Sequence, residues 1–165
     1  STKKISRDEA ILNVIKLSKN MMLSTREIIK KLNLGLIEDL GFESALVELF
    51  ENWKRRFIGV NFEYKIDDKA LKKITKQKTA HLYRIFQEAL TNIAKHSAPK
   101  NIKISIKSVE AKDKIRILIS NDGINTDLVN QEGLGLIGIA ERVDQINGSL
   151  EVIKKKLFKI IINMG

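Results

Sequence analysis

Three polar side chains, Glu88, Asn92 and His96, recur every four residues in the segment LYRIFQEALTNIAKHS. This spacing places them on one flank of an α-helix, beside its apolar face. A polar row at the edge of a buried stripe is costly unless something binds it. An amide oxygen can coordinate Mg²⁺, a carboxylate can orient or deprotonate a nucleophile, and Lys95 and His96 can meet phosphate oxygens. The row therefore suits a magnesium-bound polyphosphate, although a helix with a solvated polar face would show the same spacing.

Two glycine-containing turns follow this helix along the chain. The first, SNDG over residues 120–123, ends a strand pattern and is a common turn sequence. The second, GLGLIG over residues 133–138, opens a helix pattern. Its glycines let backbone N–H groups approach a phosphate, and a helix start adds partial positive charge. Dinucleotide-binding folds use a similar motif, but they expect a strand before the glycines, whereas residues 127–132 read as a polar loop.

The order and amino-acid sequences of these segments resemble those of one known family. It is the ATP-binding catalytic domain of bacterial sensor histidine kinases, which belongs to the GHKL group of ATPases, and specifically the branch paired with NarL-type response regulators. QEALTNIAKHS resembles the N box of these kinases, and GLGLIGIAER resembles their second glycine box with the continuation typical of this branch. The resemblance covers about residues 10 to 163.

The resemblance implies a histidine protein kinase with ATP and Mg²⁺ as its ligands. Such a kinase transfers the γ-phosphoryl group to a histidine, chemistry that depends mostly on positioning and charge neutralisation. Glu88 is then the candidate base or orienter of the histidine nucleophile, and Asn92 is the candidate magnesium ligand. The full ATP-binding set that the resemblance implies is Asn92, Lys95, His96, Asn121, Asp122, Gly123, Gly133, Gly135, Leu136 and Gly138.

The residue that reads adenine is left open between two neighbours, Asn121 and Asp122. The family has an Asp-x-Gly here whose Asp binds the adenine amino group. This sequence has Asn121 at the matching position and Asn125 in place of a second glycine. An amide oxygen can still accept a hydrogen bond from the amino group, without the charge of a carboxylate. The alternative is that Asp122 faces the base.

Apolar periodicity predicts the elements that position these residues. Isoleucines alternate with polar residues over 101–108 and 114–120, which predicts two strands joined by a turn at 110–113. The whole pattern predicts an α+β fold, a two-layer α/β sandwich whose mixed, mainly antiparallel sheet is covered by helices on one face, preceded by a long N-terminal helix. The predicted helices are 6–32, 43–56, 79–97 and 138–146, and the predicted strands are 60–66, 101–108, 114–120, 150–153 and 157–163.

The N-terminal helix is apolar on two sides, so it needs partners on both, although packing wholly within its own domain is the alternative. By resemblance, residues 1–33 are part of the second helix of a dimerisation and phosphoacceptor domain, and residues 34–165 are the ATP-binding catalytic domain. The segment LNLGLIEDLGF over residues 32–42 resembles the box that connects them, with Asn33 and Leu34 where the family usually has Arg and Pro. The implied partners are a second copy of the chain, through this helix, and a NarL-type response regulator.

Composition excludes several classes. The chain has 165 residues, 43% of them hydrophobic, and no cysteine, which excludes disulfides, thiolate metal sites and cysteine nucleophiles. The net charge is +10, but the lysines are scattered without an arginine cluster or an aromatic platform, which favours a solvated surface and no nucleic-acid partner. No apolar run is long enough to span a membrane, so we expect a cytoplasmic domain. Because the sequence does not begin with Met, the full-length protein could carry a membrane anchor elsewhere.

The chain has two histidines, His81 and His96, and neither stands in a setting that resembles the family's phosphoacceptor box. The acceptor is therefore expected outside this sequence. A competing hypothesis keeps the fold without the catalysis, as a GHKL-fold pseudo-kinase or a dimerising interaction module. The missing acceptor and the amide at Asn121 permit that hypothesis, and measured ATP affinity separates the two. A third hypothesis, a basic nucleic-acid binder, would show salt-dependent DNA binding.

Overall fold

The computed structural model describes residues 7–109, 114–123 and 134–165, which form a sheet in the strand order β1-β2-β3-β5-β4 with helices around it. The helices are α1 (Arg7–Leu40), α2 (Phe42–Arg56), α3 (Asp68–Lys72), α4 (Lys76–His96) and α5 (Leu134–Gln145). The strands are β1 (Asn61–Ile66), β2 (Asn101–Val109), β3 (Lys114–Asn121), β4 (Gly148–Lys154) and β5 (Phe158–Met164). β1 pairs with β2 in parallel and the other neighbours are antiparallel, so the predicted mixed, mainly antiparallel sheet is confirmed.

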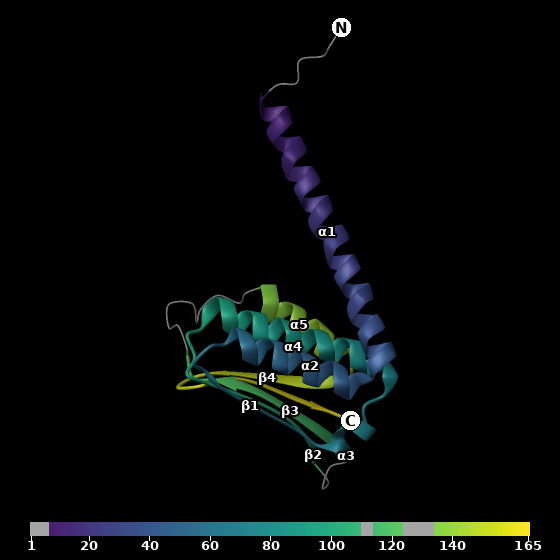
Figure 1. The fold of residues 1–165 in the computed structure, drawn as a ribbon, viewed down its shortest axis with the longest axis vertical. Helices are drawn as coiled ribbons and strands as arrows, with labels where there is room; N and C mark the ends of the chain where they lie inside the picture. The colour runs from purple at the N-terminus through teal and green to yellow at the C-terminus, as the bar shows by residue number, and fades with distance from the viewer. Residues whose placement is uncertain (1–6, 110–113, 124–133) are drawn as a thin grey trace.

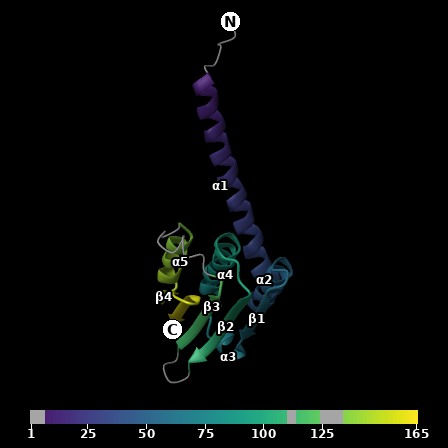
Figure 2. The same ribbon diagram turned by 90° about the vertical axis from the view of Figure 1, so that its left-hand side faces the viewer.

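Helices α2, α4 and α5 lie over one face of this sheet, with α4 in the middle (Figure 1, Figure 2). The alternation of side chains along the strands explains this arrangement. On β2, Ile102, Ile104 and Ile106 are buried, whereas Lys103 and Lys107, which point to the opposite face, are exposed. The helices cover the isoleucine face and leave the lysine face open, which is the two-layer sandwich that the sequence predicts.

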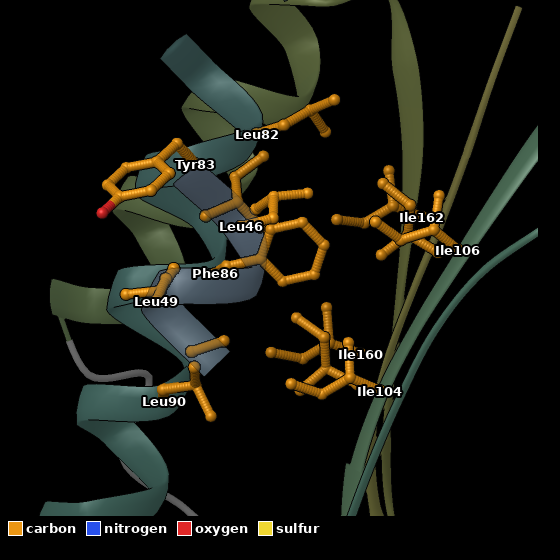
Figure 3. Packing of buried hydrophobic residues seen from close by; sticks show 14 of the residues in the cluster. Leu46, Leu49, Leu82, Tyr83, Phe86, Leu90, Ile104, Ile106, Ile160 and Ile162 are labelled. Atoms are coloured by element: carbon orange, nitrogen blue, oxygen red, sulfur yellow. The ribbon is translucent and has the colours of Figure 1, made fainter. Parts of the chain in front are cut away.

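The hydrophobic core fills the space between the helices and the sheet. Figure 3 shows Leu46 of α2 and Phe86 of α4 turned toward the strand residues Ile106 and Ile162, and all four side chains are fully buried. Burying a leucine or phenylalanine side chain contributes about 1.5–3 kcal/mol. Tyr83 of α4 points away from the sheet (Figure 3). This packing fixes the rotation of α4 and therefore the direction of its polar flank.

Helix α1 is longer than the sequence predicts. It continues through most of the predicted connector, 32–42, and ends at Leu40. The following residue, Gly41, has a φ of +81°, a left-handed conformation that favours glycine and stops the helix. The apolar spacing that resembles a connecting box therefore forms a helix in this chain. The predicted domain boundary at residues 33–34 falls inside α1 and stays a prediction.

The first half of α1 extends away from the rest of the molecule (Figure 1). Near its end, Ile37 joins the core, and α1 contacts α2 and α4 there. No helix in the part of the chain that the structure describes is long and apolar enough to cross a membrane. Among the described side chains of α1, the large apolar ones left exposed in its first half are Ile11, Leu12, Val14, Ile15, Leu17, Met21 and Met22, and Leu40 is exposed at its end.

Two short features also differ from the sequence predictions. Helix α3 was not expected, because five residues are too few for a periodic pattern; the Asp67 carboxylate caps it by accepting a hydrogen bond of 3.0 Å from the Lys69 N–H. Helix α5 begins at Leu134 rather than at residue 138, so residues 134–138 of the second glycine motif lie inside its first turns. After α5, Asn147 adopts a left-handed conformation with a φ of +54°.

Candidate functional site

The polar row on α4 borders the core, as the spacing predicts. Glu88 and Asn92 are half-buried, and Lys95 and His96 are exposed near the end of the helix. Their neighbours toward the sheet, including Ala89 and Ile93, are buried and hold the helix in place. The row therefore starts at the edge of the core and rises to the surface at the carboxyl end of α4.

The beginning of α5 contacts this row at Gly135. A Cβ atom added to Gly135 would lie 2.6 Å from Glu88 Oε1 and 2.7 Å from both Asn92 Oδ1 and Nδ2. Only a glycine allows this approach without displacing the two polar side chains. The first N–H groups of a helix have no intrahelical partner and carry partial positive charge. A carboxylate, an amide and the start of α5 thus meet in one polar site between α4 and α5.

Asn121, the last residue of β3, is a buried amide without a partner. It is 1% exposed, and neither its Oδ1 nor its Nδ2 atom has a hydrogen-bond partner among the described residues. Leaving a buried polar group unpaired costs about 1–3 kcal/mol. Alternation along β3 places Asn121 on the face of Ile117 and Ile119, which the helices cover. Both a donor and an acceptor of this buried amide are therefore left unsatisfied by the described residues.

Asp122 is engaged in the protein itself. Its Oδ1 atom accepts hydrogen bonds from the backbone N–H groups of Lys100 (2.8 Å) and Asn101 (2.9 Å). Its Oδ2 atom accepts a third, of 2.7 Å, from the Asn101 side-chain amide. The Asn101 side chain, followed by these backbone N–H groups, lowers the pKa of the Asp122 carboxyl. Asp122 therefore ties the end of β3 to the start of β2.

Gly123 lies against the backbone that leaves α4. A Cβ atom at this position would be 2.4 Å from the carbonyl carbon of Ala98 and from the nitrogen of Pro99. The two chain segments approach so closely that a side chain cannot fit. Gly123 thus determines how the end of β3 packs beside the end of α4.

The remaining glycine-motif residues play different parts. Leu136 is half-buried and packs against the core, so only its backbone could face a ligand. A Cβ atom at Gly138 would be 3.1 Å from Arg142 Nη1, and the Gly138 carbonyl accepts a hydrogen bond of 2.6 Å from that nitrogen. Gly133 and the segment before it, residues 124–132, lie outside the described residues.

A groove lies along α4 on the side that faces α2. It is an open groove of about 540 Å³ between α2 and α4, lined by residues that include Asn52, Trp53 and Gln87. Glu88 borders it, but Asn92 and Asn121 do not. Arg84 of α4 lines it as well, so the groove adjoins the polar site at α5 along Arg84 and Glu88.

Two arginines near the site were missed by sequence reasoning. Arg84 precedes Glu88 by one helical turn on α4, and Arg142 lies on α5. Burial, followed by the positive charge of Arg142, lowers the pKa of the Arg84 guanidinium. The four-residue spacing from Arg84 to Glu88 could have added Arg84 to the polar row, whereas the approach of Arg142 depends on how α4 and α5 pack.

Replacing Asp122 with asparagine is expected to lower thermal stability without weakening nucleotide binding. The variant keeps one acceptor atom but points an NH₂ group at the Asn101 amide. Because the folded-state pKa is lowered, the carboxylate stabilises the protein above its unfolded pKa, and this stability is lost as pH falls through the folded pKa. The Tm difference from the parent chain should therefore shrink between pH 7 and about pH 3. Unchanged Tm with reduced ATP affinity would instead assign base reading to Asp122.

Comparisons with known proteins show the family to which the chain belongs. Residues 77–163, more than half of the chain, match the family model of the histidine kinase-, DNA gyrase B-, and HSP90-like ATPases. Sensor histidine kinase LiaS of Bacillus subtilis is 28% identical over 117 residues, which cover 71% of this chain and 31% of LiaS. The signal transduction histidine-protein kinase/phosphatase DegS of Brevibacillus brevis is 29% identical over 154 residues, 90% of this chain and 39% of DegS.

Structural similarity extends over nearly the whole chain. The histidine kinase domain of the blue-light activated histidine kinase EL346 from Erythrobacter litoralis superposes with a TM-score of 0.69 at 13% identity, covering 97% of this chain and 86% of that domain. At that identity the likeness concerns the fold. The chain spans about a third of LiaS and two-fifths of DegS. Because the matching family model covers more than half of its residues, the chain belongs to the histidine kinase-, DNA gyrase B- and HSP90-like ATPase family.

Proposed function

We propose that the chain is the ATP-binding catalytic part of a two-component sensor histidine kinase. It would transfer the γ-phosphoryl group of ATP to a histidine outside these residues. Family membership and the names of both relatives support this assignment. The observation that carries it is the contact of Gly135 with Glu88 and Asn92. This contact brings a helix start suited to phosphate together with an amide that could bind magnesium and a carboxylate.

Bound Mg·ATP would supply the transferable phosphoryl group and a metal ion that neutralises its charge. Asn92 suits the metal, since its amide oxygen lies beside Gly135 at the start of α5, where the phosphates are proposed to bind. The described residues contain no cluster of three or more His, Cys, Asp or Glu side chains that could hold a metal ion. Mg²⁺ fits a site with few protein ligands, because it keeps several waters and takes other oxygens from substrate phosphates.

The other residues of the site take complementary parts in this proposal. Glu88 would orient or deprotonate the incoming histidine. Lys95 and His96 are exposed at the end of α4, where their side chains can reach phosphate oxygens. The backbone around Gly135 and Gly138 would receive the phosphates. None of these parts requires a large movement of α4, which the core holds in place.

Asn121 is the better candidate for reading adenine. Its buried amide offers an oxygen to the adenine amino group and an N–H to a ring nitrogen, and the protein satisfies neither atom. The Asp122 carboxylate already accepts three hydrogen bonds from β2 and the residue before it. An amide in place of the family's usual carboxylate would still recognise adenine through these two hydrogen bonds.

The rest of the signalling pathway would lie outside this chain. The exposed apolar side chains along the first half of α1 suit packing against a second copy, so we propose a homodimer through α1. The acceptor histidine would then belong to a helix that precedes α1, and the phosphoryl group would pass on to a NarL-type response regulator. The relatives of this chain are two to three times longer, which leaves room for such segments.

Calorimetric titration with ATP and Mg²⁺ tests the proposed function. We expect binding in the micromolar to millimolar range, and we expect Asn92→Ala to weaken the Mg²⁺-dependent part about tenfold or more, the worth of a charge-assisted contact. Its stability should change by less than about 1 kcal/mol, because Asn92 lies beside the core rather than in it. Asn52→Ala, an exposed asparagine on α2, is the control and should bind like the parent chain.

Absence of heat and of any thermal shift at millimolar Mg·ATP would overturn this function. The fold would then serve the competing hypothesis, a pseudo-kinase or dimerising module that has kept the scaffold without the ligand. If Asn92→Ala instead unfolds the domain while nucleotide affinity persists in the folded fraction, Asn92 is a structural residue and the metal assignment is wrong.

A further inference from the structure

Helices α4 and α5 run in opposite directions, and their register brings Arg84 of α4 level with Arg142 of α5. At the start of α4, the Lys78 ammonium donates a hydrogen bond to the Gly165 carbonyl. Gly148, just after α5, pairs with Met164 of β5 beside that carbonyl. The start of α4 and the end of α5 are therefore at the same end of the sheet, while the start of α5 meets the middle of α4 through Gly135.

Opposite directions give the two helices a simple register. Gly135 faces Glu88 and Asn92, so a position two turns further along α5 faces a position about one turn before Glu88 on α4. Those positions are Arg142 and Arg84. The lowered pKa of Arg84, to which the charge of Arg142 contributes, agrees with this register. Two cationic side chains from different helices therefore converge beside Glu88.

Neither guanidinium is neutralised by a carboxylate of the residues that the structure describes. Arg84 Nη1 donates to the Gln87 side-chain oxygen at 3.0 Å, and Arg142 Nη1 donates to the Gly138 carbonyl at 2.6 Å. Both acceptors are neutral. A guanidinium has five N–H donors, so each arginine keeps donors for a further partner. Half-buried like charges repel each other, and a bound anion would relieve this repulsion.

The polarity of the proposed nucleotide site identifies the anion. Asn121 lies at the end of β3, near the carboxyl end of α4 through the contact of Gly123 with Ala98. From there, Asn92, Glu88 and Arg84 follow one another along α4 at intervals of about 6 Å. A nucleotide with its base at Asn121 and its metal at Asn92 would point its terminal phosphate toward Glu88 and Arg84.

We propose that Arg84, assisted by Arg142, binds the γ-phosphoryl group of ATP and neutralises its charge during transfer. This inference rests on the proposed function and adds to it a residue pair that recognises the third phosphate. A planar guanidinium suits a phosphoryl group because it can donate two parallel hydrogen bonds to it. Such a pair stabilises the group most when charge builds on it during transfer to the acceptor histidine.

Titration with two nucleotides tests the pair on the chain as it stands. Arg84→Gln and Arg142→Gln are each titrated with Mg·ADP and with the Mg²⁺ complex of β,γ-imido-ATP, which keeps a third phosphate but is not transferred. We expect ADP affinity to stay within about twofold, whereas the triphosphate analogue binds about tenfold more weakly, the worth of a lost charge-assisted hydrogen bond. Arg84→Lys should restore part of the loss, because it keeps the charge without the planar fork.

Arg116→Gln is the matched control. Its guanidinium also donates to a neutral amide, Asn163 at 3.1 Å, but lies on the open face of the sheet. It should bind both nucleotides like the parent chain. If Arg84→Gln loses affinity for ADP and for the analogue equally and has a lower Tm, Arg84 only supports the fold. If its affinities for both nucleotides are unchanged, Arg84 contacts no phosphate. Either result overturns this inference while ADP binding by the parent chain preserves the proposed function. Failure of the parent chain to bind either nucleotide would overturn both.

Discussion

Replacing Asn121 with leucine is expected to make the ligand-free protein more stable and to weaken ATP binding at least about tenfold. Asn121 is buried, and both polar atoms of its amide are unpaired among the described residues. Leucine has the same branched skeleton without polar atoms, so the desolvation penalty of about 1–3 kcal/mol disappears. The adenine contact proposed for the amide disappears with it. Thermal unfolding without ligand and titration with Mg·ATP measure the two effects separately.

Ser108→Ala is the matched control for this experiment. Ser108 Oγ is also buried without a partner, but Ser108 pairs with Ile115 at the other end of β2. Its removal should stabilise the chain slightly and leave ATP affinity unchanged. If leucine is too large for this position, Asn121→Ala serves instead, because it also removes the amide and should also weaken ATP binding. A less stable Asn121→Leu chain with normal ATP affinity would mean that the amide supports the fold rather than the ligand.

This pairing of stability and function follows from where the amide lies. A protein selected for stability alone would place an apolar residue at a position that continues the series Ile115, Ile117 and Ile119 on the covered face of β3. An unpaired amide at that position lowers stability in the empty state and is compensated when a ligand binds. The same logic applies to the two half-buried arginines beside Glu88.

Local periodicity was enough to predict most of the scaffold. The alternation of isoleucine with lysine or serine in β2 and β3 places one face of the sheet toward helices, and the structure confirms the sheet and the covering layer. The apolar face of α4 likewise determines the direction in which Glu88 and Asn92 point. These predictions succeed because neighbouring residues and burial of one face decide them.

Predictions failed where a single residue or a distant segment decides the outcome. The helix α1 continues past residue 32 because only Gly41, with its positive φ, interrupts the leucine-rich pattern. α5 starts four residues earlier than predicted, since Gly135 lies against Glu88 and Asn92 of α4, a contact that local sequence does not reveal. The choice between Asn121 and Asp122 turns on strand register, because one residue moves a side chain to the opposite face. Extending the isoleucine alternation by one step would have favoured Asn121.

The glycines of the site could be found by motif, but their separate roles could not. Gly135 and Gly123 both resemble ligand-binding positions in the family. In the structure, a Cβ at Gly135 would meet the polar ends of Glu88 and Asn92, whereas a Cβ at Gly123 would meet backbone atoms of Ala98 and Pro99. Side chains can turn aside and backbone cannot. This difference predicts that an added methyl group costs more stability at Gly123 than at Gly135.

Gly123→Ala is expected to destabilise the chain by about 3 kcal/mol, at the upper end of overpacking costs, because its methyl group would lie 2.4 Å from the Ala98–Pro99 backbone. For a chain of this size, Tm should fall by roughly 6–12 °C. Gly35→Ala, in the interior of α1 with nothing within 4 Å of the added Cβ, is the matched control and should stabilise the chain by about 0.5–1 kcal/mol. Thermal and urea unfolding of both variants, without nucleotide, measure the difference. If Gly123→Ala keeps the parent Tm and only loses ATP affinity, Gly123 acts on the ligand, as the resemblance implies, and the close approach to Ala98 relaxes at little cost.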